Sequence, residues 1–170
     1  FSDIFEENYF PSVPFQGGFG LMNIHGIAKP AYRAYEILHA LGTELMPVDG
    51  QHETVDAWLV RDGKAATIVL NNFALPRHPI ATETVTFTLK GNGPVKSATI
   101  QRIDLEHANA KRRWEQMGKP EYLSARLVDE LHEVSKLQSE SLSLGEKDGR
   151  TVSDVDMPLQ AVAAIRLEWD

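Results

Sequence analysis

The sequence has 170 residues, a formal net charge of −7 and a hydrophobic share of 42%, which is enough for an ordinary core. It contains no cysteine, which excludes disulfides, a thiol nucleophile and thiolate metal sites. Its one basic run, residues 111–113, is short and flanked by acids, so we expect no nucleic-acid partner. No apolar run approaches the roughly 20 residues that span a bilayer, so no membrane partner is expected. The lack of cysteine fits a reducing compartment and favours a cytoplasmic location, although the periplasm or secretion stays open.

The first 42 residues read as one β/α unit. "FSDIF" predicts a short buried strand, followed at once by Glu6 and Glu7. A loop rich in proline, glycine and aromatic residues comes next, a composition typical of functional loops. "KPAYRAYEILHALG" then predicts a helix with Pro30 at its first position and Gly42 as a left-handed stop. The predicted buried stripe comprises Ala31, Ala34, Tyr35, Leu38 and Leu41.

From residue 43 the pattern becomes β. Residues 43–50 look like a connector, and Asp62-Gly63 predicts a type I′ hairpin turn between two strands. Alternating threonines and apolar residues predict a half-buried strand at 82–90, and 97–104 predicts another. Weaker strands are expected on both sides of the "EKDG" turn. The closing strand should bury one face, made of Ala161, Ala163, Ile165, Leu167 and Trp169. Several short strands with turns between them favour a β-sandwich.

One helix is expected to interrupt this sandwich. "SARLVDELHEVSKL" offers Ser124 as an N-cap, because its hydroxyl can accept from a free backbone N–H of the first turn. The predicted buried stripe of this helix is Leu127, Val128, Leu131 and Val134.

The chemistry-bearing residues give little direct signal. The six histidines are scattered and show no metal-ligand spacing, and no serine nucleophile or dinucleotide motif is present, so we expect neither metal nor cofactor. His107 is expected to be a hydrogen-bonded structural residue, and the three tryptophans are expected in the core. Glu6 and Glu7 are either solvated acids or, if "FSDIF" is a barrel strand, carboxylates at the face where barrel active sites form. Spacing does not choose between the two.

Longer stretches do carry a resemblance. "FSDIFEE" and "PFQGGFGLMNIHGIAKPAYRAYEILHALG" resemble the last barrel strand, loop and helix of β-xylosidases of glycoside hydrolase family 39. "RIDLEHANAKRRWEQMGKPEYLS" and "MPLQAVAAIRLEW" are similar to segments of that family's sandwich. The resemblance covers nearly the whole chain. Gln16 and Ala108 depart from it, since the family pattern has His and Ser there.

The resemblance implies a mixed fold: residues 1–42 as the terminal β/α unit of an incomplete (β/α)8 barrel and 43–170 as an accessory β-sandwich. It implies a C-terminal fragment of a retaining β-1,4-xylosidase that acts on xylo-oligosaccharides from the non-reducing end. Retention requires two carboxyl groups about 5–5.5 Å apart. In the family both catalytic glutamates lie upstream of position 1, so this chain alone is predicted to be inactive. The resemblance assigns substrate binding to Glu6, Glu7, Phe15 and Phe19.

Its implied partners are xylose-containing substrates and the remainder of the barrel, and it leaves room for a homo-oligomer. Two alternatives stay open. One is another family member, such as an α-L-iduronidase-type enzyme, but the segment around Glu6 lacks the basic residue that iduronate calls for. The other is a non-catalytic sandwich that serves as a carbohydrate-binding or oligomerisation module. The scarcity of aromatic residues after residue 60 argues against that role.

Overall fold

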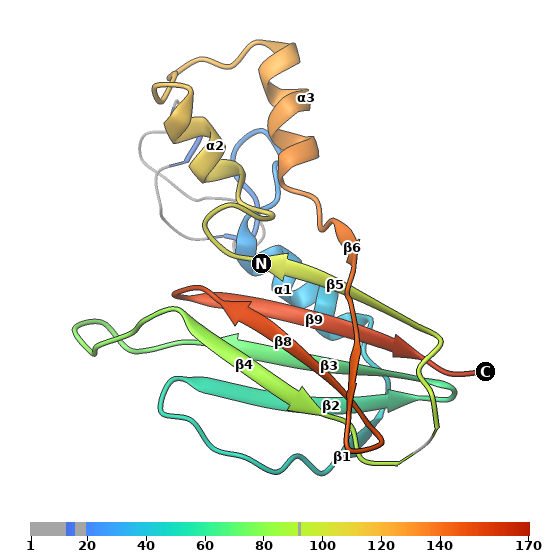
Figure 1. The fold of residues 1–170 in the computed structure, drawn as a ribbon. Coiled ribbons are helices and arrows are strands. Elements are labelled where there is room, and N and C mark those ends of the chain that lie inside the picture. The colour runs from blue at the N-terminus through green and yellow to red at the C-terminus, as the bar shows by residue number, and fades with distance from the viewer. Residues whose placement is uncertain (1–12, 16–19, 92) are drawn as a thin grey trace. The chain divides into compact units, whose positions relative to one another are not determined.

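The computed structural model describes residues 13–15, 20–91 and 93–170 (Figure 1). The chain forms two compact units. Unit 1 comprises Phe1–His39 and Ile103–Gln138, and unit 2 comprises Ala40–Arg102 and Ser139–Asp170. The described part of the chain is mostly antiparallel sheet with few helices. Unit 2 holds the sheets and unit 1 holds the helices.

Unit 2 contains two sheets. The six-stranded sheet has the order β1-β2-β3-β9-β5-β6, and the three-stranded sheet has the order β4-β8-β7. Neighbours within these sheets include the antiparallel pairs β1–β2, β2–β3, β3–β9, β5–β6, β4–β8 and β7–β8. The strands are β1 (Glu44–Met46), β2 (Val55–Asp62), β3 (Ala65–Asn72), β4 (Glu83–Thr88), β5 (Ser97–Ile103), β6 (Ser139–Ser141), β7 (Gly145–Lys147), β8 (Arg150–Met157) and β9 (Ala161–Glu168).

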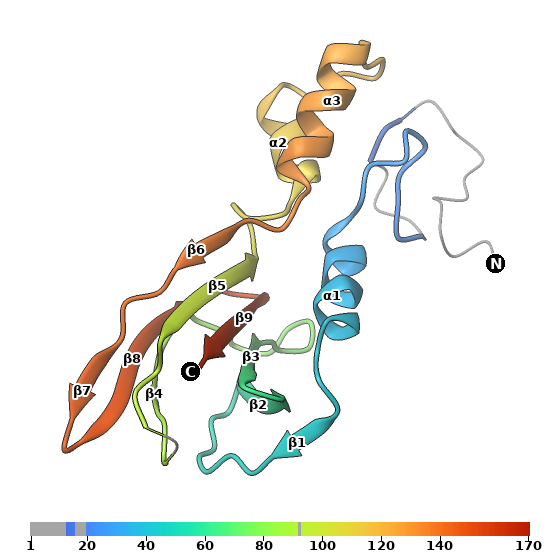
Figure 2. The same ribbon diagram turned by 90° about the vertical axis from the view of Figure 1, so that its right-hand side faces the viewer.

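The core of unit 2 lies between these sheets. Figures 1 and 2 show β4 and β8 stacked against β3 and β9. Alternation along each strand points every second side chain inward, so both sheets contribute to one apolar layer. The fully covered members include Leu70, Ile100, Val155, Met157, Ile165 and Leu167. The predicted inward face of the closing strand is confirmed, because Ala161, Ala163, Ile165 and Leu167 are all buried and Trp169 packs against them.

The strand predictions hold with local corrections. β4 shows the expected alternation of half-buried and exposed residues. The connector expected at 43–50 contains β1, which pairs with β2. The weak strand expected at 141–145 is instead two short strands, β6 and β7, that belong to different sheets. The chain therefore crosses from one sheet to the other between Ser141 and Gly145.

Two Asp-Gly pairs make different turns. Asp62 pairs with Ala65, so the loop of the β2–β3 hairpin is Gly63 and Lys64. Gly63 has a φ of 59° and Lys64 has no positive φ, as in a type II′ turn rather than the predicted type I′. The type I′ pattern occurs at Asp148-Gly149, where both residues have positive φ, 52° and 71°, between β7 and β8. The hairpin was predicted correctly and its turn type was wrong.

Helix α1 (Pro30–His39) begins at Pro30 as predicted. The prediction of its buried face is wrong, because Ile37 is the buried residue, whereas Ala31, Tyr35 and Leu38 are exposed. The helix carries apolar residues on more than one side, so periodicity could not select the packed one.

Gly42 was predicted as a left-handed helix stop, and this is also wrong. Its φ is not in the left-handed region. A Cβ atom at Gly42 would overlap the backbone carbonyl of Arg61, so this position needs glycine because two backbone segments meet there.

Unit 1 contains two helices between β5 and β6, where the sequence predicted one. α2 (Ala110–Gln116) is capped by the side chain of Asn109, which accepts from the backbone N–H of Arg112. α3 (Ala125–Val134) is capped by Ser124 as predicted. Its expected buried stripe is confirmed in part, because Leu131 is fully buried whereas Leu127, Val128 and Val134 are half-buried. Figure 2 shows the two helices side by side, and Arg113 of α2 donates two hydrogen bonds to Glu130 of α3.

The two units do not follow the predicted division of the chain at residue 42. That division concerned an enzyme domain and its accessory domain, and it stays a prediction. The structure adds that residues 103–138 group with the N-terminal segment rather than with the sheets. None of the helices in the described residues has both the length and the apolar character that crossing a membrane would require.

Candidate functional site

Of the four residues predicted to bind substrate, Glu6, Glu7 and Phe19 lie outside the described residues. Phe15 is described, and it is 4% exposed. Its substrate role stays a prediction. The structure does show what surrounds Phe15 and the loop that leads from it to α1.

Phe15 sits in a small apolar core of unit 1. Its ring centroid lies 5.6 Å from that of Trp114 in α2, with the ring planes tilted by 49°. This is a favoured offset geometry for aromatic pairs. The core also contains Ile27, Ala110 and Leu131. The indole N–H of Trp114 donates to the carbonyl of Pro120 over 2.9 Å, which fixes the ring. The loop before α1 is thus packed onto α2 and α3, two helices about a hundred residues later in the chain.

The second half of this loop, residues 21–29, is held by Asn23. The side chain of Asn23 is fully buried, and its Oδ1 accepts from the backbone N–H groups of His25 and Ile27, both over 2.9 Å. Met22 and Ala28 form an antiparallel bridge, and Gly26 supplies the positive φ of 73° at the turn. The Nδ2 of Asn23 has no hydrogen-bond partner among the described residues. A buried donor without a partner costs free energy.

Arg33 ties α1 to the end of α3. Its Nε donates to the backbone carbonyl of Ser135 over 2.6 Å, and its Nη2 donates to the Ser135 hydroxyl over 3.1 Å. Ser135 is fully buried, and its own hydroxyl donates to the carbonyl of His132. A planar guanidinium suits such a paired contact, and lysine could not reproduce it. Nothing in the sequence spacing pointed to this pair, because the two residues are far apart along the chain.

His107 is hydrogen-bonded as expected. Its Nδ1 lies 2.8 Å and 2.9 Å from the two oxygens of Asp104. The Asp104 side chain is only 5% exposed and also accepts from the backbone N–H groups of Glu106 and His107. The carboxylate thereby fixes the turn that leads into α2. The aspartate followed by polar residues in "RIDLEHAN" is the sequence signal that could have predicted this turn.

The contacts described above are packing, capping and turn contacts. The described residues contain no group of three or more histidines and acids arranged to hold a metal ion. Among them, a clearly shifted pKa occurs at Asp49 and Glu168, both exposed carboxylates of unit 2. A hydrogen bond and then the charge of Lys90 lower the pKa of Asp49. Hydrogen bonds from Arg166 and Ser97 lower that of Glu168. These are surface ion pairs, and neither is a general acid or base in a cleft.

Comparison with known proteins shows a family match and several relatives. The family model "Glycosyl hydrolases family 39" matches residues 1–151. A β-xylosidase of Caldicellulosiruptor saccharolyticus is 37% identical over 171 residues, which covers 99% of this chain and 35% of the relative. A β-xylosidase of Geobacillus stearothermophilus is 34% identical over 131 residues, covering 77% of this chain and 25% of the relative.

The fold is also similar to solved structures. The crystal structure of a monomeric β-xylosidase from Caulobacter crescentus CB15 matches with a TM-score of 0.71 and 27% identity, over 93% of this chain and 34% of that one. The chain spans about a third or less of the length of these relatives. Since the family model covers most of the sequence, the chain belongs to glycosyl hydrolases family 39.

Proposed function

We propose that this chain forms the C-terminal part of a retaining β-1,4-xylosidase that removes xylose units from the non-reducing end of xylo-oligosaccharides. The observation that carries the proposal is the 37% identity to a β-xylosidase along 99% of the chain. The relatives described above are β-xylosidases, which favours xylose over iduronate. A cytoplasmic location is part of the proposal.

In this proposal residues 1–42 are the last strand, loop and helix of the catalytic barrel. One feature of unit 1 supports it. The exposed residues Tyr35 and Leu38 leave one side of α1 without cover, and barrel helices pack against neighbours on such sides. The catalytic glutamates lie outside these 170 residues.

Glu6 and Glu7 would bind the hydroxyls of the terminal xylose, with Glu7 the stronger candidate, and Phe15 and Phe19 would shape the pocket wall. Phe15 is buried against Trp114, so we propose that it packs beneath the residues of the pocket wall rather than contacting the sugar directly. Helices α2 and α3 would hold the active-site loop in place through that ring pair and through Arg33 and Ser135.

A segment exchange tests the proposal. The matching segment of the Caldicellulosiruptor saccharolyticus β-xylosidase is replaced by this chain, and hydrolysis of an aryl β-xyloside is measured. We expect turnover by the chimera and none by the isolated 170-residue chain. Glu7→Gln in the chimera should lower kcat/KM roughly 10- to 100-fold, because a charge-assisted hydrogen bond is worth about 1.5–3 kcal/mol. Glu121→Gln, an exposed acid in the α2–α3 loop, is the matched control.

Two results would contradict the proposal. One is a folded chimera without β-xylosidase activity. The other is turnover by the isolated chain that Glu7→Gln abolishes, since this chain would then contain its own catalytic carboxylates.

A further inference from the structure

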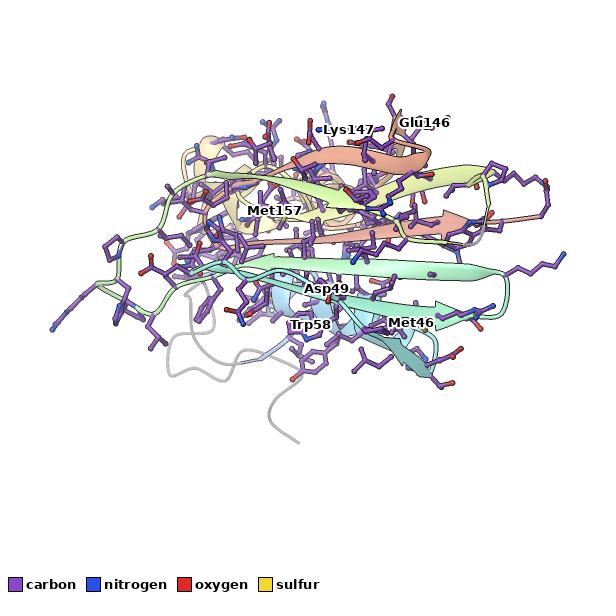
Figure 3. All side chains as sticks on the ribbon, turned by 60° about the horizontal axis from the view of Figure 1, so that its bottom comes forward. Met46, Asp49, Trp58, Glu146, Lys147 and Met157 are labelled. Carbon is purple, nitrogen blue, oxygen red and sulfur yellow. The ribbon has the colours of Figure 1, made fainter. Side chains whose placement is uncertain are left out.

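Trp58, on the outer face of the six-stranded sheet, is exposed to solvent, although the β3 residue opposite it, Val69, is only 3% exposed. Trp58 lies in the middle of β2, opposite Val69 of β3. Its neighbours Ala57 and Leu59 point toward the core, so alternation directs Trp58 to the other side of the sheet. Figure 3 shows Met157 between the two sheets and Trp58 beyond β3, on the outer side. Trp58 is 44% exposed, in contrast to Trp114 at 5%, so the expectation that it belongs to the core is wrong.

Two polar side chains lie next to Trp58 on this face. Asp56 precedes it by two residues on β2, and Asn71 of β3 is the direct partner of Asp56 in the sheet. Directly opposed residues have Cβ atoms about 4.5–5.5 Å apart, and diagonal neighbours are within reach of long side chains. Within the described part of the chain, no hydrogen bond or ion pair engages the side chain of Asp56 or of Asn71. A flat aromatic ring thus stands beside a free carboxylate and a free amide.

This combination matches the chemistry of a sugar. The C–H faces of a pyranose ring are apolar and stack on an indole, while its hydroxyls donate to a carboxylate and exchange hydrogen bonds with an amide. Xylose suits an aromatic ring face particularly well, because its ring has no hydroxymethyl group to lift it from the aromatic surface. One ring and two polar side chains offer few contacts, so binding should be weak and should favour chains of several sugars over a monosaccharide.

A protein partner is the rival occupant, since Leu45 and Val60 pair on the same face and Leu45 is 69% exposed. The charged side chain of Asp56 disfavours a protein partner at this face. A protein that covered Trp58 would also cover this carboxylate, and a buried charge without a partner is costly. Charged residues are accordingly depleted in the centre of protein interfaces. Sugar hydroxyls would satisfy Asp56, whereas an apolar protein surface would not.

We propose that Trp58, Asp56 and Asn71 form a surface binding site for xylose-containing oligosaccharide or polysaccharide chains. The choice of xylose rests on the proposed function, whereas the site itself rests on the geometry of β2 and β3. A xylosidase would use such a site to hold a polymeric substrate close to the enzyme. The site requires no catalytic residue, so binding can be measured on this chain as it stands.

The test is a titration of the 170-residue chain with xylohexaose, followed by the indole N–H signals of its three tryptophans in a ¹H–¹⁵N spectrum. We expect the Trp58 signal to shift with a dissociation constant on the order of 1 mM, the weak end of specific binding. Trp58→Ala should weaken binding at least about tenfold, and Asp56→Ala or Asn71→Ala about threefold to tenfold, as expected for losing about 1 kcal/mol. Tyr122→Ala removes another exposed aromatic side chain, in unit 1, and should change nothing.

Retardation in a gel that contains soluble xylan gives an independent readout with the same variants. Trp58→Phe keeps an aromatic face and should retain part of the binding, which separates loss of stacking from loss of folding.

An unshifted Trp58 signal at a xylohexaose concentration 20-fold above the expected dissociation constant, roughly 20 mM, overturns the proposal. Equal binding of cellohexaose overturns the assignment to xylose. Concentration-dependent dimerisation that Trp58→Ala abolishes would show that the face binds a second copy of the chain instead. If the chimera lacks β-xylosidase activity but this chain still binds xylohexaose, the proposed activity is refuted and the proposed binding site is not.

Discussion

The two compact units build their cores in different ways. In unit 2 the core comes from alternation along strands, and residues such as Leu70 and Ile165 face inward because of their place in a strand. In unit 1 the core joins Phe15 and Ile27 to Trp114 and Leu131, from segments about a hundred residues apart. A local pattern is therefore enough to specify the first core, while the second exists only once the chain has folded back. Because the two cores are separate, we expect a single core substitution to destabilise the unit that contains it and to leave the other unit unchanged.

The largest effect is expected from Trp114→Ala. It removes a large buried side chain, its contact with Phe15 and its hydrogen bond to Pro120, so unit 1 should lose about 3–5 kcal/mol of stability. Hydrogen exchange by segment should show faster exchange in residues 20–29 and in α3, with β3 and β9 unchanged. Tyr122→Ala, at an exposed aromatic position of the same unit, should change stability by less than about 0.5 kcal/mol. Equal loss of protection in β3 and β9 would show that the two units unfold as one.

A smaller effect is expected in unit 2 from Asn72→Ala. Asn72 is fully buried at the end of β3, and its Nδ2 lies within hydrogen-bond distance of the carbonyls of Ala81, Met157 and Pro158. Alanine would remove the two N–H donors that these three carbonyls share at a point where two loops meet, at a cost of about 2–3 kcal/mol. The neighbouring Asn71→Ala, which breaks no such contact, should stay within about 0.5 kcal/mol. Urea denaturation measures both, and equal midpoints for the two variants would contradict the role of Asn72.

The same contrast explains how much of the fold could be predicted. The faces of β4 and β9 follow from alternation, and the cap of α3 follows from Ser124, because these signals are local. The type of the β2–β3 turn was missed because Asp62 is itself the last residue of β2. Which face of α1 is buried was missed because that choice depends on a packing partner rather than on the helix. Trp58 was assigned to the core from residue type, whereas its strand register turns it outward.

The site was predictable only in part, for the same reason. The loop around Phe15 could be identified from its composition and its resemblance to the family, but the residues that pack against the loop could not. Trp114 and Ser135 are held against this loop and α1 by tertiary contacts that leave no spacing in the sequence. Asp104 is the exception, since an aspartate before polar residues indicates a turn locally. Sequence reasoning thus finds the elements of unit 1 but not the contacts that join them.

The smallest expected effect concerns how unit 2 covers an edge strand. The loop between β1 and β2 reaches both ends of β4: Asp49 lies 2.6 Å from Lys90, just after the strand, and His52 lies 3.5 Å from Glu83 at its start. Edge strands are commonly protected in this way from pairing with other chains. The Asp49–Lys90 pair is well exposed, so its contribution to stability is small and is best measured through ionisation.

Lys90→Met should raise the pKa of Asp49 toward its ordinary value of 3.8, because the hydrogen bond and the positive charge that lower it are lost. A lowered folded-state pKa means that the pair stabilises the fold above the unfolded-state pKa, and that this contribution disappears as pH falls through the folded-state value. The difference between wild type and variant should therefore narrow below about pH 4. Carboxyl carbon shifts recorded against pH measure the titration of Asp49. Glu168, whose pKa is lowered mainly by Arg166 and Ser97, is the internal control and should titrate identically in both proteins. An unchanged Asp49 titration would mean that Lys90 does not hold the loop beside β4 in solution.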